Sequence, residues 1–418
     1  MNRVAIVGAG WAGCAAALSA AQLGHHVTLF EAARTVGGRA RAAFEYEGHR
    51  IDNGQHILIG AYTATLGLLR QLDISLEQAL CRLPLDLRDA QGHGLALPRV
   101  APPWGTAIGI LRARGWSLAD KISLLQAAAH WRKAGFKCPD GQTVAELCAG
   151  LTPAVRERLI DPLCVAALNT PAGHASAQVF LRVLQDALFS GPGGSDLLLP
   201  RVDLGTLMPE AVAAWLGRRG MELRRSHRVQ SVARRAQGFQ VDGEAFDRVI
   251  LACPPWDCDR LLQENAEAQA WLARARTLRF NAIATVYLRD PRVRLPRPLL
   301  ALPAQTAGDA QFVFDRGQLD GPPGLLAFVV SDSAGDATAL ETAVLAQATR
   351  QLGLSGLQRV RTVIEKRATF ACVPRLDRPP MQIGEALLAC GDYIAGPYPA
   401  TLEGAVRSGL MAAQALNG

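Results

Sequence analysis

The chain has 418 residues, 49% of them hydrophobic and 19% charged, a globular balance that allows a large core. The formal charge of +7 comes from arginine, because only four lysines are present. This charge suits an anionic membrane surface better than nucleic acid, since no nucleic-acid-binding motif accompanies it, and we expect no nucleic-acid partner. The nine cysteines form no C-x-x-C pair, so we expect no metal site and a reducing compartment.

The first motif is a glycine-rich turn between a predicted strand and a predicted helix. Val4–Val7 is typical of a buried parallel strand, and Cys14–Leu23 is an Ala-rich helical segment. The G-x-G-x-x-G spacing between them gives a tight turn and brings the first helical N–H groups to a pyrophosphate. The residues expected to contact a dinucleotide here are Gly8, Gly10, Trp11, Ala12 and Gly13.

A second predicted strand, His26–Phe30, ends in Glu31, whose carboxylate can accept hydrogen bonds from a ribose. The order of strand, glycine turn, helix, strand and acid therefore predicts a dinucleotide site. A glycine pair then brings the chain close to the ligand, and Arg39 offers a forked cation to the pyrophosphate. The further residues assigned to this site are Ala32, Arg34, Gly37, Gly38 and Arg39.

The stretch Arg41–Ile51 predicts a strand or hairpin that leads into the sequence DNGQHILIGAY at 52–62. Small and amide-bearing residues after a strand suit close approach to a ligand. A helix over Tyr62–Leu72 should close this first portion. The ligand-facing residues expected in the loop are Asn53, Gly54, Gln55 and His56.

Between about residues 81 and 200 the pattern becomes mostly helical. Ser117 and Thr143 are expected N-caps. The predicted helices are Gly105–Leu111, Ser117–Lys133, Val144–Cys148, Pro153–Leu168 and Ala177–Phe189.

The segment from Trp104 to Lys137 has two interpretations. Its three tryptophans are interleaved with cations, among them Arg112, Arg114, Arg132, Lys133 and Lys137, as on an amphipathic surface that lies in a membrane interface. The other interpretation is a set of ordinary helices with core tryptophans and solvated charges, which we favour because no stretch keeps a sustained amphipathic face.

The remaining chain is predicted to return to the dinucleotide. Strands are expected at Val229–Ala233 and Arg248–Ala252, and a strand at Leu387–Cys390 is followed by Gly391 and Asp392. A helix over Ala405–Leu416 comes next. In between, we expect three strands and one helix, at Ala282–Leu288, Gln311–Phe314, Leu325–Val330 and Ala339–Leu352.

The pattern E-x-x-R-x-x-G-G-R at 31–39 and the Gly-Asp pair near the C-terminus resemble the flavin amine oxidase and carotenoid desaturase superfamily. The stretches 52–62 and 391–405 are more similar to its squalene-associated branch, the hydroxysqualene dehydroxylases. The resemblance implies an α/β fold, in which an FAD-binding Rossmann-like domain of the glutathione-reductase type is interleaved with an α+β substrate domain. The expected division is 1–80, 195–265 and 371–418 for FAD, with 81–194 and 266–370 for substrate.

The same resemblance implies roles for individual residues. The loop 53–56 would lie beside the flavin, and the backbone of Val229 would touch the adenine. Asp392 would hold a ribityl hydroxyl with Gly391 beside it, while the amides near Thr401 and Leu402 would face the flavin N1–C2=O edge.

The implied reaction is reduction of hydroxysqualene to squalene, with hydride from N5 of reduced FAD and loss of the hydroxyl as water. His56 is the named candidate for the proton donor, with a purely structural role as its alternative. The alternatives in order are a phytoene-type desaturase, an amine oxidase and a non-redox prenyl-lipid binding protein. No lysine occurs on Asn281–Leu288, where amine oxidases usually place one near N5.

The expected partners are a C30 polyisoprenoid lipid and an electron donor that the sequence does not identify. Val4–Leu23 has no charge, but its glycine pattern argues against a membrane span. We therefore expect a cytoplasmic protein, with peripheral contact at the inner membrane face as one option.

Overall fold

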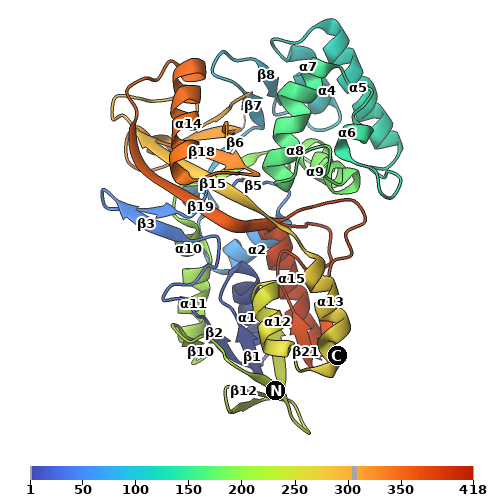
Figure 1. The fold of residues 1–418 in the computed structure, drawn as a ribbon, viewed down its shortest axis with the longest axis vertical. Helices are drawn as coiled ribbons and strands as arrows, with labels where there is room; N and C mark the ends of the chain where they lie inside the picture. The colour runs from blue at the N-terminus through green and yellow to red at the C-terminus, as the bar shows by residue number, and fades with distance from the viewer. Residues whose placement is uncertain (1, 304–307, 418) are drawn as a thin grey trace.

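The computed structural model describes residues 2–303 and 308–417. Its α/β fold has two layered regions, and the two ends of the chain lie together in the lower one in Figure 1. A six-stranded sheet of order β10-β2-β1-β14-β21-β20 forms the centre of that region. Its strands are parallel apart from the β20–β21 pair. They are β1 (Arg3–Val7), β2 (His26–Phe30), β10 (Glu222–Arg224), β14 (Arg248–Leu251), β20 (Gln382–Gly384) and β21 (Leu387–Ala389).

The first and last long helices pack against one another beside this sheet. Helix α1 (Trp11–Gln22) is almost wholly buried, as its run of alanines requires, and contacts α15 (Leu402–Gln414) and α11 (Pro209–Gly217). A Cβ added at Gly409 of α15 would lie 2.1 Å from the carbonyl oxygen of Ala12. The two helix backbones are therefore in direct contact, which a side chain at 409 would prevent.

The remaining elements of the lower region surround the same sheet. The hairpin expected over 41–51 is confirmed: its strands join through a turn at Glu47 and Gly48, both with positive φ. These elements are β3 (Ala42–Tyr46), β4 (His49–Asp52), α2 (Thr63–Gln71), α3 (Leu76–Ala79), α10 (Leu204–Leu207), β11 (Val232–Arg234), β12 (Phe239–Val241), β13 (Glu244–Phe246), α12 (Pro255–Leu262), η2 (Ala266–Ala268), α13 (Gln269–Thr277) and η4 (Ala415–Asn417).

The upper region contains a five-stranded antiparallel sheet of order β16-β17-β18-β15-β19. Side chains of β15 alternate: Ala284, Val286 and Leu288 pack under α14, while Tyr287 belongs to the core on the opposite face. The elements are β15 (Phe280–Arg289), β16 (Leu299–Ala301), β17 (Phe312–Asp315), η3 (Arg316–Gln318), β18 (Leu325–Ser331), α14 (Ala337–Leu352) and β19 (Gln358–Phe370).

A cluster of helices lies beside this sheet, at the top of Figure 1. Both expected N-caps are confirmed, because Ser117 and Thr143 each form a reciprocal capping box with the acid three residues later. The elements of this part are β5 (Leu58–Ile59), β6 (Leu80–Leu83), β7 (Asp86–Arg88), β8 (Gly94–Ala96), α4 (Trp104–Arg112), α5 (Leu118–Lys133), α6 (Val144–Leu147), α7 (Pro153–Val155), η1 (Arg156–Ile160), α8 (Asp161–Leu168), α9 (Ala177–Phe189) and β9 (Leu197–Pro200).

Some predicted bounds were wrong. The strand expected at Val229–Ala233 begins only at Val232, because the N–H groups of Gln230 and Ser231 donate to the side-chain carboxylate of Asp242. The helix expected over Ala405–Leu416 begins at Leu402, because Thr401 caps it. The helix expected over Pro153–Leu168 is interrupted by η1, a π-helical turn. Among the described residues, no helix combines the length and apolarity needed to span a bilayer.

Candidate functional site

The glycine-rich turn leaves no room for side chains at two of its three glycines. A Cβ at Gly13 would lie 1.8 Å from the carbonyl oxygen of Gly8, and one at Gly8 would lie 2.7 Å from that of Ala252. At Gly10 the nearest neighbour is the Cα of Gly38, at 3.8 Å. The turn is therefore packed tightly on itself and on Ala252, which follows β14, but is open at Gly10, the side on which a pyrophosphate could approach.

Glu31 is fixed at the end of β2 by two backbone donors. Its Oε2 accepts from the N–H of Ala9 and its Oε1 from that of Ala33, both at 2.8 Å. Each carboxylate oxygen keeps a second lone pair, so the group can still accept hydrogen bonds from a ribose. Ala32 and Arg34, also assigned to the cofactor, are exposed on the turn that follows.

Arg39 connects the two ends of the predicted cofactor site. Its Nη2 lies 2.6 Å from Oδ1 of Asp392, and its Nη1 donates to the carbonyl oxygen of Ala368. Burial alone would lower the pKa of Arg39, but Asp392, with help from Glu365, outweighs burial and raises it. Asn53 donates to both the carbonyl oxygen of Arg39 and Oε2 of Glu365, at 3.3 and 3.1 Å.

The loop after β4 is held by a hydrogen-bond chain that the sequence did not reveal. Gln55 donates to the hydroxyl of Tyr287 at 2.9 Å, and that hydroxyl donates to the carbonyl oxygen of Asp52 at 2.8 Å. Buried Arg316 donates to Oε1 of Gln55 at 3.3 Å. These contacts make β15 and η3 the support of the loop that carries Gly54.

Asp52 itself is a buried carboxyl group. Its Oδ1 accepts from the N–H of Leu204 at 2.9 Å. Burial raises the pKa of Asp52 to about 7, against the lowering effects of that bond and of Arg316. Burial thus shifts the pKa of the carboxyl group at the start of this loop toward neutrality.

His56 lies in the same loop, with its Nδ1 3.1 Å from the carbonyl oxygen of Gly54. Burial lowers the pKa of His56, the carbonyl contact raises it, and the charge of Arg39 lowers it further, so the net direction is down. The neutral ring would donate from Nδ1–H to Gly54, which leaves Nε2 as an acceptor. Within the described part of the chain, Nε2 has no hydrogen-bond partner.

The start of α15 is fixed by two side chains. Thr401 accepts from the N–H of Gly404 at 3.0 Å, as an N-cap. Glu403 is fully buried and accepts from the N–H groups of Ala64 and Thr65 and from the Thr65 hydroxyl, and it also pairs with Arg407. The first turns of α2 and α15 are thus held together around one carboxylate.

Thr285 of β15 has an unsatisfied hydroxyl group close to Gly54 of the loop. It is 1% exposed, and its hydroxyl oxygen has no hydrogen-bond partner among the described residues. A Cβ added at Gly54 would lie 3.6 Å from that oxygen. The open side of Gly10, the free lone pairs of Glu31, the cation of Arg39 and this unsatisfied hydroxyl together fit a large bound dinucleotide such as FAD.

The structure therefore brings several predicted residues together and adds others. The two ends of the chain meet at Arg39 and Asp392, and Asn53 is tied to the same cluster. Val229 is buried, and its carbonyl oxygen accepts from Arg260 at 2.7 Å. Two residues before it, the N–H of His227 donates to the carbonyl oxygen of Glu31 at the end of β2. Residues that sequence reasoning missed are Asp52, Thr285, Tyr287, Arg316, Glu365 and Glu403.

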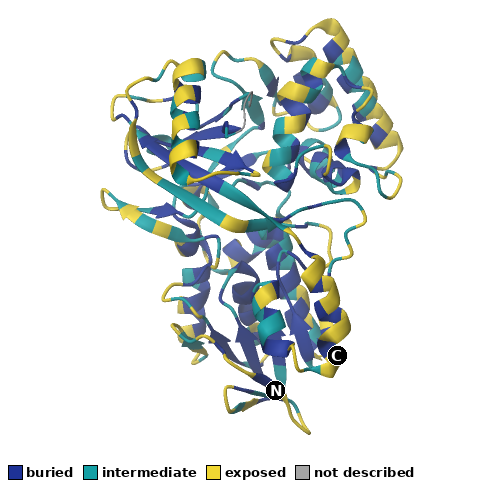
Figure 2. Ribbon diagram, in the orientation of Figure 1, coloured by how far each residue is buried: buried dark blue, intermediate teal, exposed yellow. Residues whose placement is uncertain are grey.

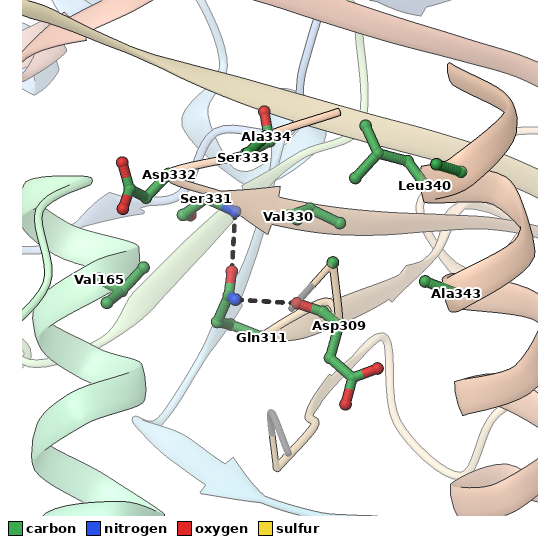
Figure 3. Close-up of a pocket in the computed structure, with 12 residues that line it drawn as sticks. Val165, Asp309, Gln311, Val330, Ser331, Asp332, Ser333, Ala334, Leu340 and Ala343 are labelled. Carbon is green, nitrogen blue, oxygen red and sulfur yellow. Dashed lines mark hydrogen bonds between the residues drawn. The ribbon is translucent and has the colours of Figure 1, made fainter. Parts of the chain in front are cut away.

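A separate cavity of about 290 Å³ lies between α8, the end of β18 and α14 (Figure 3). Gln311 spans it by accepting from the N–H of Ser331 at 2.8 Å and donating to the carbonyl oxygen of Asp309 at 3.0 Å. Among the described residues, its lining includes none that we predicted for the cofactor. We therefore assign it no part in the dinucleotide site.

Comparison with known proteins gives full-length matches. Residues 11–417 match the family profile described as flavin containing amine oxidoreductase. Hydroxysqualene dehydroxylase of Zymomonas mobilis is 26% identical over 99% of this chain and 98% of its own length. The enzyme of the same name from Sinorhizobium fredii is 29% identical over 99% and 97%. A crystal structure of an oxidoreductase from Methanosarcina mazei is 16% identical, with a TM-score of 0.75 over the whole of both chains, and shows the same fold.

Proposed function

The chain belongs to the flavin containing amine oxidoreductase family, and from that premise we propose that it is a reductive dehydroxylase that converts hydroxysqualene to squalene. It is a flavoenzyme, and FAD is its cofactor. The observation that carries the proposal is the end-to-end match to relatives named hydroxysqualene dehydroxylase.

The residues of the site support a reaction on a largely apolar molecule. The polar groups at the loop are few, and most are already used within the protein: Gln55 and Tyr287 bond each other, while Arg316 bonds Gln55. The Nε2 atom of His56 remains for a substrate, because the free hydroxyl of Thr285 is among the groups that fit the bound dinucleotide. A substrate with a single hydroxyl matches such a site better than a polar amine does.

In the proposed reaction, one carbon–oxygen bond of hydroxysqualene breaks and one carbon–hydrogen bond forms. Reduced FAD, when bound, supplies the hydride, and an electron donor of unidentified class must reduce it again. The hydroxyl leaves as water and needs one proton. His56 would orient the substrate hydroxyl through Nε2 and, in its protonated form, give that proton.

The roles of the binding residues follow from their contacts. Glu31 would accept from the adenosine ribose, and Arg39 would face the pyrophosphate. Asp392 would bond the ribityl chain once Arg39 turns to the ligand. The first turn of α15 at Thr401 and Leu402 would place N–H groups and a positive helix end toward negative charge. A lipid substrate also favours a place at the inner face of the membrane.

An anaerobic turnover experiment tests the proposal. The purified protein is reduced with dithionite, hydroxysqualene is added, and flavin absorbance is followed while the lipid is extracted. We expect reoxidation of the flavin with one squalene formed per flavin. Bleaching of the oxidised protein by phytoene, with no response to hydroxysqualene, would instead identify a desaturase. A response to amines alone would also overturn the proposal.

A further inference from the structure

Exposed apolar side chains are concentrated on one short part of the chain. Over residues 2–303 and 308–417, eight large hydrophobic side chains are exposed, and five of them lie between residues 100 and 122. Trp104 and Leu118 are the most exposed, at 72% and 70%. The five residues are Val100, Trp104, Leu111, Leu118 and Ile122. The other three, Leu23, Trp256 and Met411, belong to separate elements, so this group is a patch rather than scattered exposure.

The patch belongs to a helical hairpin. Helices α4 and α5 contact each other and are joined by residues 113–117, at the end of the molecule away from the N-terminus (Figure 1). Trp104 and Leu111 are seven residues apart and share one side of α4, and Leu118 and Ile122 share one side of α5. Figure 2 shows exposed residues along the outer turns of the helices in this cluster. We call α4, α5 and their connection the α4–α5 hairpin.

The inner sides of the same helices are apolar and already occupied. Ile110 of α4 and Leu124, Ala128 and Trp131 of α5 are buried in the core. They also border a cavity of about 30 Å³ lined by leucines of β7 and β8. Of the three tryptophans in this segment, Trp116 and Trp131 are therefore core residues, as the ordinary-helix interpretation expects. Packing in the core does not account for the exposed apolar side chains of Trp104 and its neighbours.

Within the segment that carries the patch, nearly all charged side chains are cations. Residues 99–137 carry seven cations and one acid, Asp120. The carboxylate of Asp120 is buried and accepts from Ser117 and Thr152, so it presents little charge to solvent. Within the described part of the chain, none of the seven cations pairs with a carboxylate. They are Arg99, Arg112, Arg114, Lys121, Arg132, Lys133 and Lys137.

From these observations we propose that the α4–α5 hairpin docks onto an anionic phospholipid bilayer. Trp104 lies at the level of the headgroups, the leucine and isoleucine side chains enter the acyl boundary, and the unpaired cations contact lipid phosphates. Charge complementarity selects this partner, because a protein surface would need a matching acidic patch around an apolar centre. The docking does not depend on the reaction, whereas delivery of substrate from the bilayer through this face rests on the proposed function.

Vesicle sedimentation of the FAD-loaded protein tests the docking. Vesicles of phosphatidylcholine alone are compared with vesicles that contain phosphatidylglycerol as well. We expect at least about tenfold stronger partitioning onto the anionic vesicles, since each cation near such a surface contributes about fivefold. The variant W104S/L118S/I122S should lose at least about tenfold of this binding. The variant R112Q/R114Q/K121Q removes three of the seven cations, so it should lose most of the preference for anionic lipid and keep weak binding to both vesicles.

A matched control is L23S/W256S/M411S, which removes the other exposed hydrophobic side chains and should bind as the wild type does. Equal binding by W104S/L118S/I122S and by wild type would overturn the proposal. Light scattering gives a second test. If the wild type is a dimer and W104S/L118S/I122S is a monomer, the proposal is overturned too, because the patch would then join two copies of the chain. Vesicle binding is read without turnover. If binding is as expected but hydroxysqualene is not reduced in detergent, only the proposed function fails.

Discussion

Arg39 and Asp392 are 353 residues apart in the chain, and their side chains meet at 2.6 Å. This ion pair is where the N-terminal glycine motif and the C-terminal Gly-Asp motif come together. The pair is partly enclosed, and it neutralises two groups that would each face the cofactor. The ion pair therefore fixes the two halves of the dinucleotide site relative to each other before a ligand binds.

Replacement of Arg39 by alanine should weaken FAD binding by at least about tenfold, because a forked charge-assisted contact contributes about 1.5–3 kcal/mol. Asp392 would also be left without its cation. Titration of the apoprotein with FAD, followed by flavin fluorescence, measures the effect. R3A breaks the exposed pair with Glu244 and serves as the control. Equal affinities for R39A and R3A would contradict the assigned role.

Gly13→Ala should prevent assembly of the glycine turn. The added methyl group would lie 1.8 Å from the Gly8 carbonyl oxygen, so strand and helix would have to separate. We expect loss of the bound flavin and a clear drop in the melting temperature. Gly67 in α2 has no atom within 4 Å of its Cβ position, so G67A should retain flavin and gain up to about 1 kcal/mol of stability. A yellow, stable G13A protein would show that the turn is wrongly described.

Glu403→Gln should lower the free energy of unfolding by about 3 kcal/mol. The carboxylate is fully buried and is both the acceptor for the start of α2 and the partner of Arg407, which would be left with an uncompensated charge. Urea unfolding measures the change. Glu385 pairs with Arg234 at the surface, and E385Q should change stability by less than about 0.5 kcal/mol. Similar values for the two variants would contradict this account of the α2–α15 junction.

Asp52 should make stability depend on pH in an unusual direction. Since burial raises its pKa to about 7, the folded protein holds a proton that the unfolded chain has lost by about pH 4. The free energy of unfolding should therefore fall as pH rises from about 4 to 7, by up to about 1.4 kcal/mol per pH unit, and then level off. D52N keeps an acceptor for Leu204 and should lose this slope.

The control for Asp52 is D73N, an exposed aspartate whose replacement should leave the slope as in the wild type. The measurement is denaturant unfolding at half-unit steps of pH. A D52N protein with an unchanged slope would assign the effect to other groups.

His56→Gln should lower turnover by about a hundredfold while the flavin band remains, as expected for a group that acts on the substrate. Burial lowers the pKa of His56, so only a small fraction is protonated at pH 7. If His56 gives the proton, single-turnover rates in the wild type should rise as pH falls toward that pKa and should not do so in H56Q. H49Q, at an exposed position nearby, should behave as wild type. A wild-type rate that decreases as the pH is lowered would exclude proton donation by His56 and leave it only a role in orienting the substrate.

Local patterns were enough to predict the strand, glycine turn and helix at the start of the chain and the two N-caps at Ser117 and Thr143. The turn around Gly8 and Gly13, the acid at Glu31 and these N-caps each depend on residues close together in the chain. The loop support was not predictable in this way. Tyr287 bonds Gln55 across 232 residues and Glu403 bonds Thr65 across 338, and no spacing rule relates such pairs. The strand expected at Val229 begins late because Gln230 and Ser231 donate to the carboxylate of Asp242, a side-chain contact that strand propensity does not reveal.

The close contact of α1 and α15 at Ala12 and Gly409 also bears on the order in which the protein is made. The glycine motif is made before the segment that follows residue 386, so its helix has no final partner until that segment has also been made. During synthesis the N-terminal strand and helix must therefore wait through most of translation with their apolar surface incompletely covered. Flavin can therefore bind only late, after the segments from both ends of the chain have been made and have come together.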